Sequence, residues 1–416
     1  MKILFIIWNY WPGIEGGSER QARQIASDLV KRGHHCTILT AWQETRLPKK
    51  EMKEQTDIVR LGRLVPWQKK TRRVLARLHR FIHKNIVKLS PEGGNSYDIF
   101  KRQFDFWVLL PIVYITRCSF MQEVRKELEN SLTPPDIIHL HEPSWLGGFV
   151  AQLAKPKNIP VLCQEATNPP LPKLGYDVPS RKHNERYRRC AHFIAMAPYL
   201  AKGLLQQGVL EGHIHLLPNG VKIPALAATR NDLPVVLYVG NFSQGAQWKA
   251  FDVLFDAWQI VAECQQDLRL SVLGGGDRSF WEKYVEELGC SQSIDFMGQV
   301  SNPEEYYKSA AIFVLPSRVE GMSNALLEAQ SWGLPCVVSD IPGNTAVIKD
   351  GVNGLVVPVN DSQALAAAIM RLGVDRVLRK KIGEAARKLM QDEYEAGRVT
   401  DRLVGIYEKI IAMDSV

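Results

Sequence analysis

The pattern with the most chemical content is a pair of glutamates, Glu320 and Glu328, with seven residues between them. A buried apolar strand over 311–316 is predicted before the pair, and Ser323 or Asn324 is a suitable N-cap for the helix that carries the second glutamate. The free backbone N–H groups at the start of that helix favour an anionic diphosphate or polarised hydroxyl groups. A planar carboxylate can accept hydrogen bonds from two neighbouring hydroxyls. The two glutamates and the helix start therefore suit a ligand that carries hydroxyl groups and a diphosphate.

The segment 320–328 resembles the E-x7-E signature of the large family of retaining glycosyltransferases, family four or group 1, which includes enzymes of cell-surface polysaccharide synthesis. The continuation over 329–344 is similar to the same family. The resemblance implies a GT-B fold. It also implies that Glu320 approaches the hydroxyls of the donor sugar and that Glu328 accepts hydrogen bonds from the ribose. The other donor-binding residues implied in this segment are Ser323 and Asn324.

Lys249 is the candidate cation. Members of the family commonly carry an Arg directly after the position of Gly240 and a Lys-Gly pair further along the chain. The two cations together neutralise the departing diphosphate. This chain has Asn241 at the position of the Arg and Ala250 at the position of the Gly. The resemblance therefore implies a catalytic Lys249 that acts with Glu320. Whether Asn241 binds the donor in place of the Arg, or Arg318 compensates, stays open.

Two glycine-rich turns could bring backbone close to a nucleotide. The first follows a predicted strand and consists of Gly274, Gly275 and Gly276. It is a partial GxGxxG motif with Ser279 at the third Gly position, and an ordinary turn between strand and helix explains it nearly as well. Gly16 and Gly17 precede the first predicted helix and match the family's N-terminal diphosphate or acceptor loop.

The remaining candidates are two histidines and an acid. His139 and His141 have alternating spacing in a predicted strand, which we interpret as pointing to opposite faces, unable to bind one metal together. His141 and Glu165 are candidates for acceptor or sugar contacts, although a core or surface histidine is the competing interpretation. No Asp-x-Asp motif lies in a suitable loop. We expect no metal and no cofactor, with Lys249 and backbone amides carrying the phosphate charge.

The bulk composition is that of an ordinary globular protein with two or three domains: 416 residues, 45% hydrophobic and 23% charged. Seven scattered cysteines without a CxxC pair favour reduced thiols in a cytosolic protein. The apolar run at 1–7 is too short for a secretory signal. The run at 106–116 is about half the ~20 residues of a transmembrane helix. We therefore expect a cytoplasmic protein.

Predicted strands and helices alternate along the chain, as in a parallel sheet. The strands are 3–7, 36–40, 136–141, 160–163 and 192–196, before the run 215–221, then 235–239, 268–273, 294–297, 311–315, 336–339 and 355–357. The weakly patterned stretch 223–234 is the predicted linker. The expected class is α/β with a GT-B architecture: two doubly wound Rossmann-like domains that face each other across a deep cleft, where the ligand binds.

The first expected domain, 1–222, is the acceptor side and includes a basic insertion at about 44–135. The second, 234–385, binds the nucleotide sugar. The C-terminal helices, 386–416, can cross back to the first domain.

Positive charge is concentrated in 58–91, which holds ten Lys and Arg residues and no acid, while the whole chain carries a net charge of +8. Apolar residues recur at helical spacing along 70–89, so an amphipathic helix could attach to an anionic membrane through 60–88. Packing of this apolar face on the first domain is an equal alternative. No recognition motif accompanies the charge, and nucleic acid is not an expected partner.

The resemblance implies an enzyme, a hexosyltransferase, that moves a sugar from a nucleotide-diphospho-sugar to a hydroxyl with retention at the anomeric carbon. The expected acceptor is a glycan or lipid-linked glycan of the cell surface, met at the cytoplasmic membrane face. A nucleotide-sugar epimerase of the same fold and a catalytically silent binding protein are the alternatives. A dehydrogenase would need a complete GxGxxG, and Ser279 argues against it.

Overall fold

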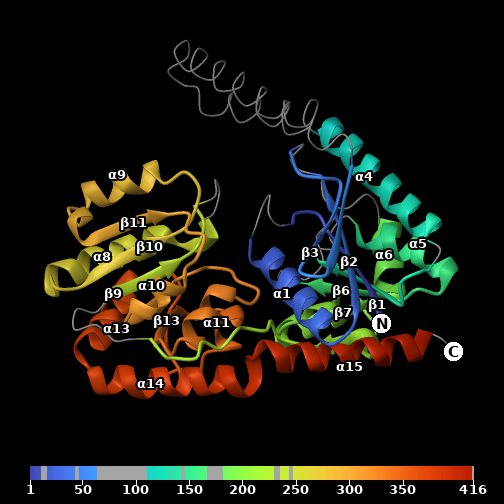
Figure 1. The fold of residues 1–416 in the computed structure, drawn as a ribbon. Coiled ribbons are helices and arrows are strands. Elements are labelled where there is room, and N and C mark those ends of the chain that lie inside the picture. The colour runs from blue at the N-terminus through green and yellow to red at the C-terminus, as the bar shows by residue number, and fades with distance from the viewer. Residues whose placement is uncertain are drawn as a thin grey trace, which may run out of the picture.

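A computed structural model of the chain describes residues 1–10, 16–42, 46–62, 110–131, 133–141, 146–165, 181–228, 235–242 and 247–414. Over these residues the chain forms two α/β domains, each built around one largely parallel sheet with helices packed on it (Figure 1). The predicted class, two Rossmann-like domains, is confirmed.

The sheet of the first domain has the strand order β3-β4-β2-β1-β5-β6-β7-β8. Its strands are β1 (Lys2–Ile7), β2 (His35–Ala41), β3 (Lys50–Lys53), β4 (Thr56–Leu61), β5 (Ile137–His141), β6 (Val161–Glu165), β7 (His192–Ala195) and β8 (Ile214–Leu216). β3 runs antiparallel to β4, and the other described neighbours pair in parallel. The continuous apolar run of β1 is buried, as expected for a strand covered on both faces.

The helices of the first domain are α1 (Gly17–Lys31), α4 (Leu110–Asn130), α5 (Gly147–Ala154), α6 (Arg181–Cys190) and α7 (Pro198–Gln206). Ala22, Ile25, Ala26 and Leu29 of α1 are buried, as their spacing predicts. Within 44–135, β3, β4 and α4 are parts of the domain itself, because β4 pairs with the central strand β2.

The sheet of the second domain has the order β11-β10-β9-β12-β13-β14. Its strands are β9 (Val235–Val239), β10 (Arg269–Leu273), β11 (Ile294–Gly298), β12 (Ile312–Leu315), β13 (Cys336–Ser339) and β14 (Leu355–Val357). Its helices are α8 (Phe251–Cys264), α9 (Ser279–Glu287), α10 (Glu304–Ser309), α11 (Asn324–Ser331), α12 (Pro342–Thr345), α13 (Ser362–Val374) and α14 (Arg376–Leu389). The candidate residues of this domain lie in loops and helix starts that follow the carboxyl ends of its parallel strands. They therefore gather at that end of the sheet.

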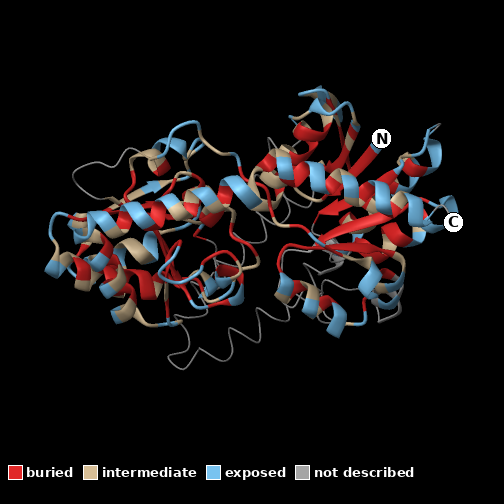
Figure 2. Ribbon diagram, turned by 90° about the horizontal axis from the view of Figure 1, so that it is seen from below, coloured by how far each residue is buried: buried red, intermediate tan, exposed pale blue. Residues whose placement is uncertain are grey.

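The C-terminal helices join the two domains. A single π-helical turn, Met390–Tyr394, connects α14 to α15 (Ala396–Asp414), and Figure 1 shows α14 along the second domain and α15 along the first. Arg32 Nε of α1 donates to Asp401 Oδ1 at 2.6 Å, and Tyr407 Oη lies 2.6 Å from His139 Nδ1. Figure 2 shows α15 from the side turned away from the first domain, where much of the helix is exposed, whereas residues such as Val399, Leu403 and Tyr407 are buried. The chain therefore returns to the domain in which it began.

The basic segment needs one correction. Arg60 lies in β4, where it is 3% exposed and donates to Glu51 Oε1 and Pro48 O. It belongs to the sheet because its guanidinium is paired there, and it cannot serve as a membrane-facing cation. The predicted amphipathic helix 70–89 and linker positions 229–234 lie outside the described residues. Among the helices that the structure describes, none combines the length and the apolar character that a membrane crossing needs.

A cluster of histidines lies where α15 docks on the first domain. The ring of His192 is 4.3 Å from that of His213 and 5.4 Å from that of His215. Burial, with smaller repulsion from His192, Lys409 and His213, lowers the pKa of His215 to about 4. Burial and His213 also lower the pKa of His192, against a raising effect of Asp414. The rings of His192 and His215 are therefore neutral in the folded protein near neutral pH.

We expect the cluster to destabilise the fold in acid. A histidine that binds its proton near pH 6.5 when unfolded and near 4 when folded takes up more protons on unfolding, so stability falls as the pH drops through this window. The loss for His215 should be on the order of 1–3 kcal/mol. Urea unfolding of the wild type and of His215→Gln at several pH values checks this. An acid dependence that is equally steep in the variant would contradict it.

Candidate functional site

Lys249 and Glu320 form an ion pair. Lys249 Nζ donates to Glu320 Oε1 at 2.7 Å, and Ser317 Oγ donates to the same oxygen at 2.8 Å. The Glu320 side chain is only 13% exposed. Lys249 ends a short 3-10 turn, and Ala250 follows it in the left-handed conformation (φ 53°, ψ 46°). A Gly, as is common in the family at this position, adopts that conformation without steric cost.

Arg318 holds the loop that carries Lys249. Its guanidinium donates to both carboxylate oxygens of Asp252 at 3.0 and 2.6 Å, to Gln247 O at 2.6 Å and to Asn360 Oδ1 at 2.6 Å. The pKa of Asp252 is lowered, because the hydrogen bonds and charge of Arg318 outweigh a raising effect of burial, which is the largest single cause. Arg318 is thus committed to positioning the loop, and the suggestion that it replaces the second phosphate cation is not supported by these contacts.

The start of α11 is the N-terminus that the sequence predicts. Ser323 is the N-cap, with its Oγ accepting from Leu326 N at 3.4 Å, and the helix ends at Trp332–Gly333, where Gly333 has φ +77°. The backbone oxygens of Glu320 and Gly321 accept from Tyr199 Oη of the first domain at 3.1 and 2.7 Å. Burial raises the pKa of Tyr199 to about 12, so its hydroxyl keeps the proton for these bonds.

Asn324 joins the domains through its side chain. Its Nδ2 donates to Gly17 O at 3.0 Å, and its Oδ1 accepts from Gln21 Nε2 at 3.1 Å and from Asn219 Nδ2 at 2.9 Å. A Cβ at Gly17 would lie 2.8 Å from Asn324 Nδ2, so a larger residue there would displace the Asn324 side chain. The starts of α1 and α11 therefore meet across the domain boundary, and the predicted donor-binding side chain of Asn324 is occupied by this junction.

Glu328 lies one helical turn beyond this junction. Tyr307 Oη of α10 donates to its Oε2 at 2.9 Å, and Arg20 Nη1 of α1 lies 3.4 Å from its Oε1. Burial raises the pKa of Glu328, while Arg20 and the hydrogen bond from Tyr307 act in the opposite direction. The carboxylate thus has a partner from each domain and is still 26% exposed.

A cavity of about 580 Å³ opens beside Glu328. It is lined by α1 with Arg20, by the connection 220–226, by α10 and by the Asn324–Trp332 face of α11. This volume lies in the range of small-molecule sites, which commonly form between domains. The predicted ribose acid therefore faces a space that could hold a nucleoside.

The glycine-rich turn 274–276 packs on backbone of the same domain. A Cβ at Gly274 would lie 2.0 Å from Gly240 O, and Gly276 (φ +111°) would bring a Cβ to 1.9 Å from Phe242 O. Asn241 Oδ1 accepts from Gly275 N at 3.0 Å. Packing of one loop on the other thus explains Gly274 and Gly276, and Asn241 has a contact of its own that the usual Arg could not make, because a guanidinium has no acceptor.

Gly16 caps the other helix at the junction. Its N–H donates to Glu19 Oε2 at 2.9 Å, and a Cβ there would lie 2.7 Å from the same oxygen. Together with Gly17, this residue places backbone of the first domain next to the start of α11.

The interpretation of the two histidines is wrong. The rings of His139 and His141 stack at 4.6 Å, and both lie against Phe5, because alternate residues of a strand share one face of the sheet. Burial lowers the pKa of His141 to about 3. Among the residues that the structure describes, no group of three or more His, Cys, Asp and Glu is arranged to hold a metal ion.

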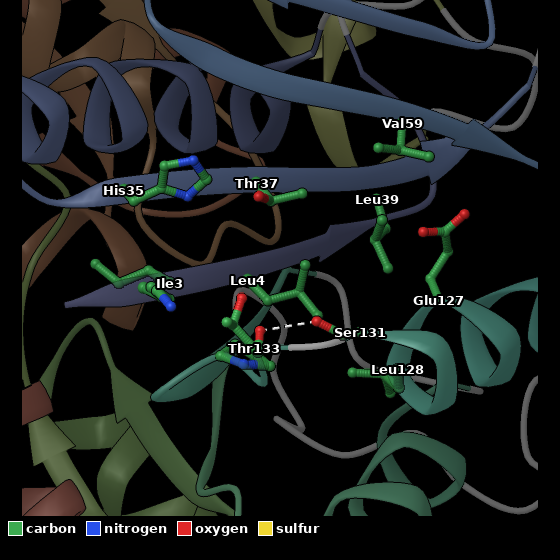
Figure 3. Close-up of a pocket in the computed structure, with 12 residues that line it drawn as sticks. Ile3, Leu4, His35, Thr37, Leu39, Val59, Glu127, Leu128, Ser131 and Thr133 are labelled. Atoms are coloured by element: carbon green, nitrogen blue, oxygen red, sulfur yellow. Dashed lines mark hydrogen bonds between the residues drawn. The ribbon is translucent and has the colours of Figure 1, made fainter.

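His141 and Glu165 lie at the carboxyl ends of β5 and β6, in the first domain. The Nε2 of His141 is buried and has no hydrogen-bond partner among the described residues. Among the described residues, the contacts of His141 do not include the Lys249–Glu320 pair, since its ring lies against His139 and Phe5. A second cavity of about 280 Å³ lies between β1, β2, β4 and the end of α4 and is lined by none of the predicted site residues (Figure 3).

Several residues of the site were not found from the sequence. Arg20 and Tyr307 contact Glu328, and Tyr199 and Asn219 contact the segment 320–324. Arg20 follows the Gly16–Gly17 pair by one turn, and this proximity is the signal that could have identified it. Tyr307 carries no such signal, since its helix is short and its partner lies elsewhere in the chain.

Two family models match the chain. The model described as "Glycosyl transferase 4-like domain" matches residues 16–220, and "Glycosyl transferases group 1" matches residues 233–375. Similar sequences include phosphatidyl-myo-inositol mannosyltransferase of Mycobacterium leprae, 27% identical over 74% of this chain and 83% of that protein. An Escherichia coli UDP-Gal:alpha-D-GlcNAc-diphosphoundecaprenol alpha-1,3-galactosyltransferase is 32% identical over 40% of this chain and 46% of that protein.

Solved structures resemble the whole chain. Sucrose-phosphate synthase of Thermosynechococcus elongatus aligns with a TM-score of 0.72 and 19% identity, over 99% of both chains. HepE of Anabaena, solved with UDP-glucose, aligns with a TM-score of 0.69 and 15% identity, over 98% of this chain and 100% of that chain.

Proposed function

The chain belongs to the group 1 glycosyltransferases and has their GT-B fold, and on this premise we propose that it transfers a sugar, with retention, from a nucleotide-diphospho-sugar to a hydroxyl of a glycan or lipid-linked glycan. The observation that carries the proposal is the Lys249–Glu320 ion pair, in which Glu320 lies in the loop just before α11, the helix that carries Glu328. We propose that the cation, the sugar-facing acid and the ribose-facing acid contact successive parts of one donor.

Lys249 and the N-terminus of α11 would stabilise the leaving group. As the bond between the anomeric carbon and the diphosphate oxygen breaks, negative charge grows on the diphosphate, and a preorganised ammonium and helix N–H groups lower the energy of that state. Glu320 would accept hydrogen bonds from the sugar hydroxyls with the oxygen that it now shares with Lys249 and Ser317. Donor binding thus exchanges an internal ion pair for contacts to both halves of the donor.

Retention would follow from attack on the face that the diphosphate leaves. The acceptor oxygen forms the new bond to the anomeric carbon, and its proton passes to an oxygen of the departing diphosphate. We assign no enzyme nucleophile, since the carboxylate of Glu320 is already paired with Lys249. The reaction is proposed to be independent of metal, so that chelation by EDTA should leave the rate unchanged.

The donor's nucleoside is proposed to lie in the cavity beside Glu328. The names of two relatives support a lipid-linked acceptor, since one acts on phosphatidyl-myo-inositol and the other on a diphosphoundecaprenol-linked sugar. HepE was solved with UDP-glucose, which makes UDP-sugars the first donors to test.

Incubation with UDP-, GDP-, ADP- and dTDP-sugars, with and without a lipid-linked glycan, tests the proposal. Release of nucleoside diphosphate that depends on the acceptor, with an α-linked product from an α-donor, is the expected result. A chemically altered sugar without transfer would indicate an epimerase. Binding of donor without any conversion would indicate a silent homologue, and either outcome would contradict the transferase.

We propose that the protein works at the cytoplasmic face of the membrane and attaches through the basic segment that follows β4. Each basic group near an anionic surface contributes up to about 1 kcal/mol, so partial engagement suffices for reversible binding. Because such attraction is screened within about 8 Å at physiological ionic strength, binding should weaken as salt rises.

Co-sedimentation with anionic liposomes at low salt tests this attachment. The charge-reversed variant replaces Arg72, Arg73, Arg77 and Arg80 with Glu. The matched control reverses four basic residues of α14: Arg376, Lys380, Lys381 and Lys388. The first variant should stay in the supernatant and the control should sediment like the wild type. Equal behaviour of the two variants would contradict attachment through this segment.

A further inference from the structure

The donor site lacks a second phosphate cation at its usual position. Asn241 stands there, and its side chain accepts from Gly275 N. Arg318 is held by Asp252, Gln247 and Asn360. A departing diphosphate carries more charge than Lys249 alone neutralises, so a further cation near the start of α11 would have a function there.

Arg20 is a cation in the right place. Its Nη1 lies 3.4 Å from Glu328 Oε1, its side chain is 40% exposed, and it lines the cavity of about 580 Å³. The starts of α1 and α11 meet through Gly17 and Asn324, and Arg20 and Glu328 each stand one turn further along their helices. Arg20 therefore faces the cavity beside Glu328, one turn from the point where the two helix starts meet.

We propose that Arg20 is a donor-binding residue supplied by the first domain: it pairs with Glu328 in the free protein and donates to the α-phosphate of the bound donor. This assignment rests on the proposed function, because it needs a nucleotide in the cavity. It also places one contact to the donor on each domain, so that donor binding favours the arrangement in which α1 and α11 meet.

The chemistry of the pair suits such an exchange. A charge-assisted hydrogen bond is typically about 2.7–2.9 Å long, so the contact at 3.4 Å is loose. A partly exposed ion pair contributes little, and loosening it costs little. The planar guanidinium has five N–H donors, so it can keep one contact to Glu328 while it presents two to a phosphate. Tyr307 continues to hold Glu328 through the other oxygen.

Titration calorimetry with uridine, UMP and UDP tests the assignment, at about pH 8, well above the ordinary pKa of a glutamate. Arg20→Ala should leave uridine affinity nearly unchanged and weaken UMP and UDP by about 10- to 100-fold, the range for a hydrogen bond to a charged group. Arg20→Lys should recover part of the loss, because it keeps the charge. The control is Arg23→Ala, on the same helix, where Arg23 pairs with Glu54 at 2.9 Å. It should match the wild type.

A loss that is equal for uridine, UMP and UDP would overturn the proposal, since Arg20 would then act only by holding Glu328. Unchanged UDP affinity in Arg20→Ala would overturn it as well.

In a Glu328→Gln background, Arg20→Ala should still weaken the binding of UMP, and absence of that effect counts against a phosphate contact. A wild type that binds no uridine, guanosine, adenosine or thymidine nucleotide would overturn the proposed function and the role of Arg20 with it. Tight binding of UDP that survives Arg20→Ala overturns the role alone.

Discussion

Replacing Lys249 with Ala should lower kcat by about 10²- to 10³-fold, the effect of removing one preorganised charge from a developing oxyanion. The physical reason is that Lys249, which lies 2.7 Å from Glu320, is the proposed cation for the leaving group. At position 241, where relatives carry a second cation, this chain has the neutral Asn241. KM for the donor should change much less than kcat, because the charge on the diphosphate grows mainly in the transition state. Steady-state rates at saturating donor measure this.

Two controls separate chemistry from folding. Lys283→Ala removes an exposed lysine of α9 and should keep the parental rate. Glu320→Gln keeps the shape and one acceptor oxygen but loses the charge that pairs with Lys249, so it should also lose turnover. If Lys249→Ala folds, as judged by circular dichroism, and turns over like the wild type at saturating donor, the catalytic assignment of Lys249 is wrong.

Glu328→Gln should weaken donor binding by about 1–3 kcal/mol, or roughly 5- to 150-fold, the range for a hydrogen bond to a charged group. The amide of Gln can still accept from Tyr307, so the local structure should persist, but it accepts more weakly from ribose hydroxyls. Calorimetric titration of the donor measures the loss. Glu287→Gln, at an exposed position of α9, is the matched control.

The same site predicts a pH dependence. Burial raises the pKa of Glu328 above its ordinary value of 4.5, so protonation begins at a higher pH than for an exposed glutamate. Protonation removes acceptor capacity, and donor affinity should therefore fall as the pH drops toward that raised pKa. Glu328→Gln should lack this part of the dependence. An identical pH profile in wild type and variant would contradict the ribose contact.

Local patterns in the sequence were enough to predict the parallel strands of both sheets except β4, and they placed the start of α11 at Ser323 or Asn324; the antiparallel strand β3 was also missed. A strand buried on both faces needs a continuous apolar run, and a helix start needs a capping side chain, so both depend on residues that are neighbours in the chain. Strands such as β9 (Val235–Val239) and β14 (Leu355–Val357) have the predicted bounds. The same periodicity already placed His139 and His141 on one face, and the opposite interpretation was an error in applying it.

Only the tertiary structure decided which side chains meet. Asn324 contacts Gly17 across the domain boundary, and Arg20 contacts Glu328 in the same way. Asn241 bonds to the Gly275 backbone because two loops of the second domain pack together. The sequence alone determined the kinds of element and the acids of the E-x7-E segment. The partners of those acids depend on how the domains dock, and periodicity carries no information about contacts between residues that are far apart in the chain.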